Sequence, residues 1–162
     1  MEIQVNTRNS GQATVALFGA INEDADAKLH LLAAELRPFG SIEFIFDKVT
    51  GINSLGVRAW VTFLRSIRNN NRKIIFSRCP PDIISQINMI PSFAEGADID
   101  SFYVNYICPS CDGTLLHLVM RQSLAPKTLP QSGRCPHCAQ AVMETEELED
   151  EYFAFLLRPT AS

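Results

Sequence analysis

Four cysteines near the C-terminal end constrain this 162-residue chain more than any other feature of its sequence. They form two Cys-Pro-x-Cys pairs, Cys108 with Cys111 and Cys135 with Cys138. A Cys-x-x-Cys turn directs both sulfur atoms to one point, and two such turns supply the four-sulfur tetrahedron that zinc prefers. We therefore expect these four cysteines to bind one metal ion.

The spacing of the two pairs resembles a zinc ribbon, in which the metal stabilises a region too small for a core of its own. Iron in a rubredoxin-like site is an alternative, but the residues that follow the two pairs, Asp112-Gly113 and Ala139-Gln140, favour zinc. A thioredoxin-like dithiol is another alternative, and the duplication of the motif argues against it. Four cysteine ligands leave no open coordination position, which predicts a structural zinc ion.

The length and composition are those of one ordinary domain with a small appendage. The chain is 46% hydrophobic and 20% charged, which is typical of a globular protein. It shows neither a signal-peptide pattern after Met1 nor an apolar stretch of ~18 residues that could span a membrane. We expect a cytoplasmic protein, and a reducing compartment agrees with cysteines that bind metal instead of forming disulfides.

Hydrophobic periodicity predicts strands that alternate with helices, which indicates an α/β layer fold. The predicted strands cover residues 2–5, 13–18, 42–46, 73–77 and 99–107, with further ones in the cysteine region at 114–120, 141–143 and 152–157. The predicted helices cover residues 25–37, 54–70 and 80–90. Strand 42–46 is almost entirely apolar, as expected of a strand that is buried on both faces of a sheet.

Two stretches resemble the STAS domain, the fold of bacterial anti-sigma factor antagonists and of sulfate transporter tails. Residues 15–22 are similar to the family's second strand and the glycine before its first helix. Residues 44–57 are similar to the strand that ends in Asp and the loop that ends in Asp-Ser-Ser-Gly. The resemblance implies a STAS-like mixed sheet with helices over residues 1–107. A zinc-ribbon-like β region, with an acidic segment and a C-terminal strand, would follow at residues 108–162.

The resemblance also implies a function in signal transduction. In the family, a serine in this loop is phosphorylated by a partner kinase, which switches binding to an anti-sigma factor. Here Asn53 stands where the family has Asp, Ser54 matches the first serine, and Leu55 occupies the position that is usually phosphorylated. Ser54 is therefore either a candidate phosphosite or, by its residue type, the N-cap of the helix that follows.

The candidate partner-binding residues lie in this loop and on the helix after it. They are Asn53, Ser54, Leu55, Gly56, Arg58, Arg65 and Arg68, and Arg72 extends the same basic stripe. A solvated helix face is the simpler explanation of such a stripe, and a surface for an acidic partner is the functional one. We expect a non-enzymatic regulatory module whose partner is a protein, such as an anti-sigma factor or a kinase-like protein.

Binding to nucleic acid or the transcription machinery through the zinc ribbon is the alternative function. Phosphate contacts need a local surplus of Lys and Arg, yet the net charge is −4. The basic residues of the cysteine region are Arg121, Lys127, Arg134 and Arg158, whereas residues 144–151 hold six acids. This acidic segment is either a solvated loop or docks on the basic stripe. The sequence has no phosphate-binding glycine loop, paired catalytic carboxylates or nucleophile elbow, so we assign no catalytic residue and expect no enzyme activity.

Overall fold

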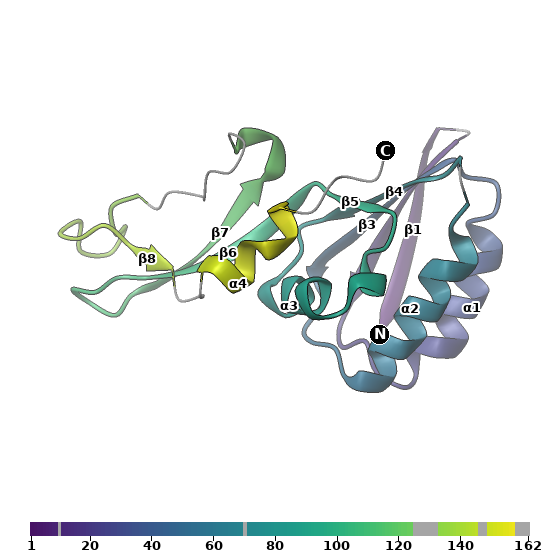
Figure 1. The fold of residues 1–162 in the computed structure, drawn as a ribbon, viewed down its shortest axis with the longest axis horizontal. Coiled ribbons are helices and arrows are strands. Elements are labelled where there is room, and N and C mark those ends of the chain that lie inside the picture. Colours follow the sequence, from purple (N-terminus) through teal and green to yellow (C-terminus); the bar gives the residue numbers. More distant parts are fainter. Residues whose placement is uncertain (10, 70, 125–132, 146–148, 158–162) are drawn as a thin grey trace.

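The computed structural model describes residues 1–9, 11–69, 71–124, 133–145 and 149–157 (Figure 1). In these residues two β-sheets follow one another along the chain. The first sheet has five strands in the order β1-β2-β3-β4-β5, and the second has three in the order β7-β6-β8. The predicted α/β fold with a mixed sheet and helices is confirmed.

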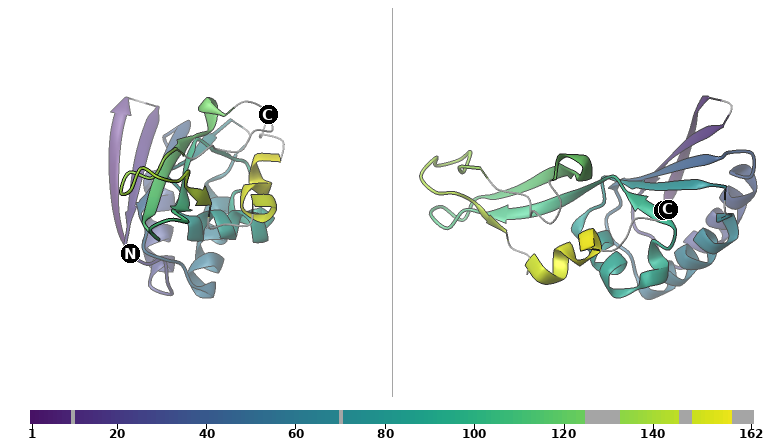
Figure 2. Two further views of the ribbon diagram at one scale, coloured as in Figure 1. Left: turned by 90° about the vertical axis from the view of Figure 1, so that its left-hand side faces the viewer. Right: turned by 45° about the horizontal axis from the view of Figure 1, so that its top comes forward.

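Strand β1 pairs antiparallel with β2, and every later pair in the first sheet is parallel. The strands are β1 (Glu2–Asn9), β2 (Gln12–Phe18), β3 (Ser41–Lys48), β4 (Lys73–Ser77) and β5 (Ala97–Ile99). The connecting helices are α1 (Ala25–Glu35), α2 (Ser54–Ile67), α3 (Pro81–Met89) and the short 3-10 helix η1 (Pro91–Phe93). From β2 to β5, each connection leads to the neighbouring strand on the same side. Because such connections are right-handed, α1, α2 and α3 all lie on one face of the sheet (Figure 2).

The one-sided helix layer determines the burial of β3. Ile42, Phe44 and Phe46 are buried beneath the helices, whereas Glu43 and Ile45 on the other face are half-buried. The prediction that this strand is buried on both faces is therefore wrong. Its second face carries an apolar residue at Ile45, but no described helix covers that face.

An aromatic cluster forms the centre of the core between the sheet and its helices. Trp60 of α2 meets Phe44 and Phe46 of β3 edge to face, with ring centroids 5.2 and 5.3 Å apart. The indole Nε1–H of Trp60 donates a hydrogen bond to the carbonyl oxygen of Phe93 at 3.1 Å. Each buried aromatic side chain contributes about 3 kcal/mol to stability, so this cluster fixes α2 on the sheet.

Strand β6 is the centre of the second sheet. The strands β6 (Ser101–Ile107), β7 (Thr114–Met120) and β8 (Glu144–Thr145) all pair antiparallel, and the 3-10 helix η2 (Arg121–Ser123) follows β7. The strand predicted over residues 99–107 is divided at Asp100, whose N–H donates to Phe76 of β4 and whose carbonyl oxygen accepts from Arg121. Asp100 therefore joins the two sheets. The domain ranges 1–107 and 108–162 remain a prediction.

The C-terminal segment returns to the helix layer of the first sheet. The helix α4 (Glu149–Tyr152) and the 3-10 helix η3 (Phe153–Leu157) lie beside α3 (Figure 1). The strand predicted at residues 152–157 is wrong, because the chain is helical here and buries Tyr152, Phe153 and Phe155. Asn88 of α3 fixes the segment, since its Nδ2 donates to the carbonyl oxygens of Glu151 and Tyr152 at 2.9 and 2.8 Å.

Two further expectations concern the same end of the chain. Where a strand was predicted at residues 141–143, the structure has one isolated bridge, between Arg134 and Val142, and β8 begins at Glu144. Residues 146–148 of the acidic segment lie outside the described residues, so its docking on the arginines stays a prediction.

No helix in the described ranges is long and apolar enough to cross a membrane.

Candidate metal centre and partner surface

The two cysteine pairs lie on turns of the same backbone design. In the first turn, the Asp112 N–H donates to the carbonyl oxygen of Cys108 at 2.9 Å, and in the second the Ala139 N–H donates to that of Cys135 at 2.9 Å. Asp112 and Ala139, each directly after the second cysteine of its pair, have positive φ angles of 54° and 56°. Each turn thereby folds back on its first cysteine.

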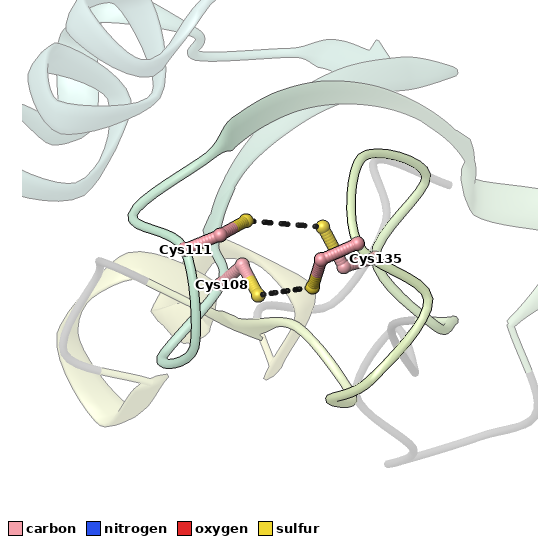
Figure 3. A group of neighbouring side chains, drawn as sticks. Cys108, Cys111 and Cys135 are labelled. Atoms are coloured by element: carbon pink, nitrogen blue, oxygen red, sulfur yellow. Dashed lines mark hydrogen bonds between the residues drawn. The ribbon is translucent and has the colours of Figure 1, made fainter.

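The four sulfur atoms converge, as the sequence predicts. All lie within 4.8 Å of one another, with Cys108 Sγ 3.6 Å from Cys138 Sγ and Cys111 Sγ 3.7 Å from Cys135 Sγ (Figure 3). A disulfide would need a separation of about 2.05 Å. Four sulfurs at about 2.3 Å from a tetrahedral zinc ion are about 3.8 Å apart, which matches the observed spacing. The cluster can therefore hold one metal ion.

The environment differs from one cysteine to the next. Cys108 and Cys135 are buried, Cys138 is half-buried and Cys111 is exposed. The backbone N–H groups of Cys138 and His137 lower the pKa of Cys135 to about 6, against the opposing effect of burial. The N–H of Gly113 acts to lower the pKa of Cys111, but hydrogen bonding with Cys108 and desolvation raise it to about 12. Metal binding would require the thiolate form of these side chains, because only deprotonated cysteines ligate a metal ion.

Gly113 allows the two turns to approach each other. A Cβ atom at this position would lie 2.8 Å from Cδ2 of His137 and 3.2 Å from Sγ of Cys111. The first distance is below any ordinary van der Waals contact, so a side chain here would displace the exposed ring of His137. This role was not predicted from the sequence, although the place of Gly113 two residues after Cys111 was the available signal.

The loop before α2 is fixed by the side chain of Asn53. Its Oδ1 accepts a hydrogen bond from the Gly56 N–H at 2.8 Å, and its Nδ2 donates to Glu23 Oε2 at 3.0 Å. Asn53 is therefore the N-cap of α2, and the interpretation of Ser54 as the cap is wrong, since Ser54 is the first helical residue and is exposed. The pKa of Glu23 is lowered by its own backbone N–H and by Asn53.

Gly56 sets the position of α2 against the connection between β2 and α1. A Cβ atom on Gly56 would lie 2.0 Å from the carbonyl oxygen of Ile21. The same connection is tied to the loop by two further bonds, from Ile21 N–H to Gly51 O at 3.0 Å and from Asn53 N–H to Ile21 O at 3.2 Å. On this rigid base the side chain of Leu55 is 55% exposed.

The antiparallel first pair, the parallel strands after it and the helices between them form a fold that can be compared with known structures. The helix-covered sheet resembles the anti-sigma factor antagonist SpoIIAA. Its unphosphorylated form matches 60% of this chain and 86% of its own, with 16% sequence identity and a TM-score of 0.46. The phosphorylated form of SpoIIAA, a Bacillus cell fate determinant, matches 60% and 90%, with 15% identity and a TM-score of 0.44. No protein-family model and no curated protein matches this chain.

The predicted arginines on α2 and after it divide into three kinds. Arg58 and Arg65 are exposed on α2. Arg68, at the end of the helix, forms an ion pair with Glu95 at 2.7 Å. Arg72 does not extend the stripe, because α2 ends at Ile67 and the Arg72 guanidinium donates to main-chain carbonyl oxygens. These belong to Arg37, Phe39 and Ile67.

Proposed function

We propose that the chain is a non-enzymatic regulatory module that binds a protein partner through the start and outer face of α2 and carries a structural zinc ion. The observation that carries the proposal is the exposure of Leu55 on a loop whose backbone is fixed by Asn53 and Gly56. An exposed apolar side chain on a rigid base loses little conformational freedom on binding, which is typical of interface residues.

The charge of α2 defines the chemistry of the proposed partner. Leu55, Arg58, Thr62 and Arg65 are exposed at helical spacing, and the helix contains no acidic residue. This face fits an apolar pocket with acids at its rim. Arg68 would contribute less, because Glu95 already neutralises it. A regulatory protein such as an anti-sigma factor or a kinase-like protein is the class of partner that we propose.

Zinc is proposed for the metal because four cysteine sulfurs at tetrahedral spacing form a closed site. The site connects the end of β6 with residues 135–138. A metal there would hold the β6–β7 hairpin against the second turn. Its function is then structural, since the four sulfurs leave no position for a substrate or a water molecule.

Affinity capture from native cell extract, followed by mass spectrometry, tests the partner surface. The wild-type chain is compared with Leu55→Asp and with the double variant Arg58→Glu/Arg65→Glu. Leu31→Asp on α1 is the matched control, since Leu31 is 72% exposed and lies on another helix. We expect a protein that wild type and the control capture and that both α2 variants lose. Equal capture by all four chains would contradict the proposed surface.

A further inference from the structure

The four outer strands of the two sheets differ in how they are protected against pairing with another strand. Unprotected edges pair with other chains, and proteins prevent this with short strands, charges or bulges. Strands β5 and β8 have three and two residues. Strand β1 carries Glu2 and has a register shift between Thr7 and Asn9. Strand β7 has seven residues, no charged side chain and an unshifted register with β6.

The hydrogen bonds at the two ends of the β6–β7 ladder show which groups of β7 face the open edge. The Arg121 N–H donates to Asp100 O at 2.8 Å, and the Cys108 N–H donates to Gly113 O at 2.9 Å. Asp100 with Arg121 and Cys108 with Gly113 are the next residue pairs at the two ends of the β6–β7 register. In an antiparallel ladder hydrogen-bonded pairs alternate, so the odd-numbered residues of β7 bond to β6. The N–H and C=O groups of Thr114, Leu116, Leu118 and Met120 therefore point to the open edge, where no described strand pairs with them.

The side chains of β7 are self-complementary about His117. Leucines flank it on both sides at Leu116 and Leu118. If two copies pair antiparallel with His117 opposite its counterpart, each Leu116 lies opposite a Leu118, and all outward backbone groups find partners. Such apolar cross-strand pairs stabilise a sheet. Leu116 is 52% exposed in the single chain, so the pairing also buries apolar surface.

The charges at the ends of β7 favour the antiparallel direction. Asp112 precedes the strand and Arg121 follows it. Antiparallel pairing brings Asp112 of one copy near Arg121 of the other, whereas parallel pairing would bring like charges together.

We propose that β7 pairs with β7 of a second copy of this chain and joins the two three-stranded sheets into one. The contact goes beyond the proposed function, because it uses neither α2 nor the metal ligands. One strand pair buries less than the ~1,200 Å² of a standard interface, so the dimer should dissociate on dilution.

Sedimentation equilibrium of the full, zinc-loaded chain over a range of concentrations tests the pairing. We expect a monomer–dimer equilibrium, with a dissociation constant raised at least about tenfold by Leu116→Lys, which puts a charge on the open edge. Leu31→Lys on α1 is the matched control and should dimerise like wild type. A monomer at every concentration, or a dimer unaffected by Leu116→Lys, would overturn the proposal.

Amide hydrogen exchange of the wild-type chain by NMR tests the register without any variant. Protection of the Leu116 and Leu118 amides should increase with protein concentration, because these amides gain partners only in the dimer. The Leu115 and His117 amides, bonded to β6, should be protected at all concentrations. If the Leu116 and Leu118 amides behaved alike at low and high concentration, β7 would not be the interface.

Discussion

Two glycines, Gly56 and Gly113, are needed for close approach and not for a special backbone conformation. Neither has a positive φ, yet a Cβ atom on Gly56 would overlap the main chain of Ile21, and a Cβ atom on Gly113 would lie 2.8 Å from the side chain of His137. The sequence resemblance assigned Gly56 to the partner surface, whereas the structure gives it a packing role beneath that surface. Such a role could not be predicted from sequence, because it depends on where Ile21 lies when the chain is folded.

Gly56→Ala should therefore destabilise the first sheet region by about 2 kcal/mol or more, since the main chain of Ile21 must move. Gly11→Ala is the control, because nothing lies within 4 Å of a Cβ there. Urea denaturation of both variants measures the difference. Equal stability of the two would show that α2 adjusts without cost.

The capping of α2 gives a second prediction for single residues. Asn53→Ala removes the bond to the Gly56 N–H and should lower the free energy of unfolding by about 1 kcal/mol. Ser54→Ala should change it by less than about 0.5 kcal/mol, because the Ser54 side chain is exposed and Asn53 is the cap. Denaturant unfolding decides between the two positions, and a larger loss in Ser54→Ala would contradict this capping scheme.

Secondary structure elements with clear periodicity could be predicted from sequence, and those set by tertiary contacts could not. In α2, the apolar residues Trp60, Leu64 and Ile67 recur at helical spacing. In β3, buried and half-buried residues alternate because the helices cover one face of the sheet. The segment 152–157 has only a short apolar pattern. In the folded chain Phe155 packs against Phe102, with ring centroids 4.9 Å apart, and this contact brings together distant parts of the chain.

The junction of β3 and β6 gives a pH-dependent prediction. The Tyr103 hydroxyl of β6 donates a hydrogen bond to Asp47 of β3. This bond, with smaller effects of Lys48 and Arg78, lowers the pKa of Asp47 against desolvation. A lowered folded-state pKa stabilises the fold above the unfolded value of about 3.9, and this stabilisation is lost as pH falls through the folded value.

Tyr103→Phe should cost about 1 kcal/mol at pH 7, since solvent partly screens the pair. The difference from wild type should shrink as the pH falls below about 3.9. Urea unfolding of both chains at pH 7 and at pH 3 measures it. A pH-independent cost of Tyr103→Phe would contradict the assigned bond.

At the scale of the whole molecule, the two sheets depend on different sources of stability. The first has an aromatic core, whereas four of the seven side chains of β7 are exposed and β8 has two residues. The spacing of the cysteine pairs was sufficient to predict that the four sulfur atoms converge, because ligand geometry is encoded locally in each turn. The division at Asp100 was not predicted, since Ile99 to Ile107 contains no glycine or proline that would mark a break in a strand.

The central claim is that Cys108, Cys111, Cys135 and Cys138 hold one zinc ion. Elemental analysis combined with zinc-edge X-ray absorption of the purified chain tests it most directly. The account predicts one zinc per chain with four sulfur neighbours at about 2.3 Å. Less than half an equivalent of metal, or nitrogen and oxygen neighbours in place of sulfur, would contradict it.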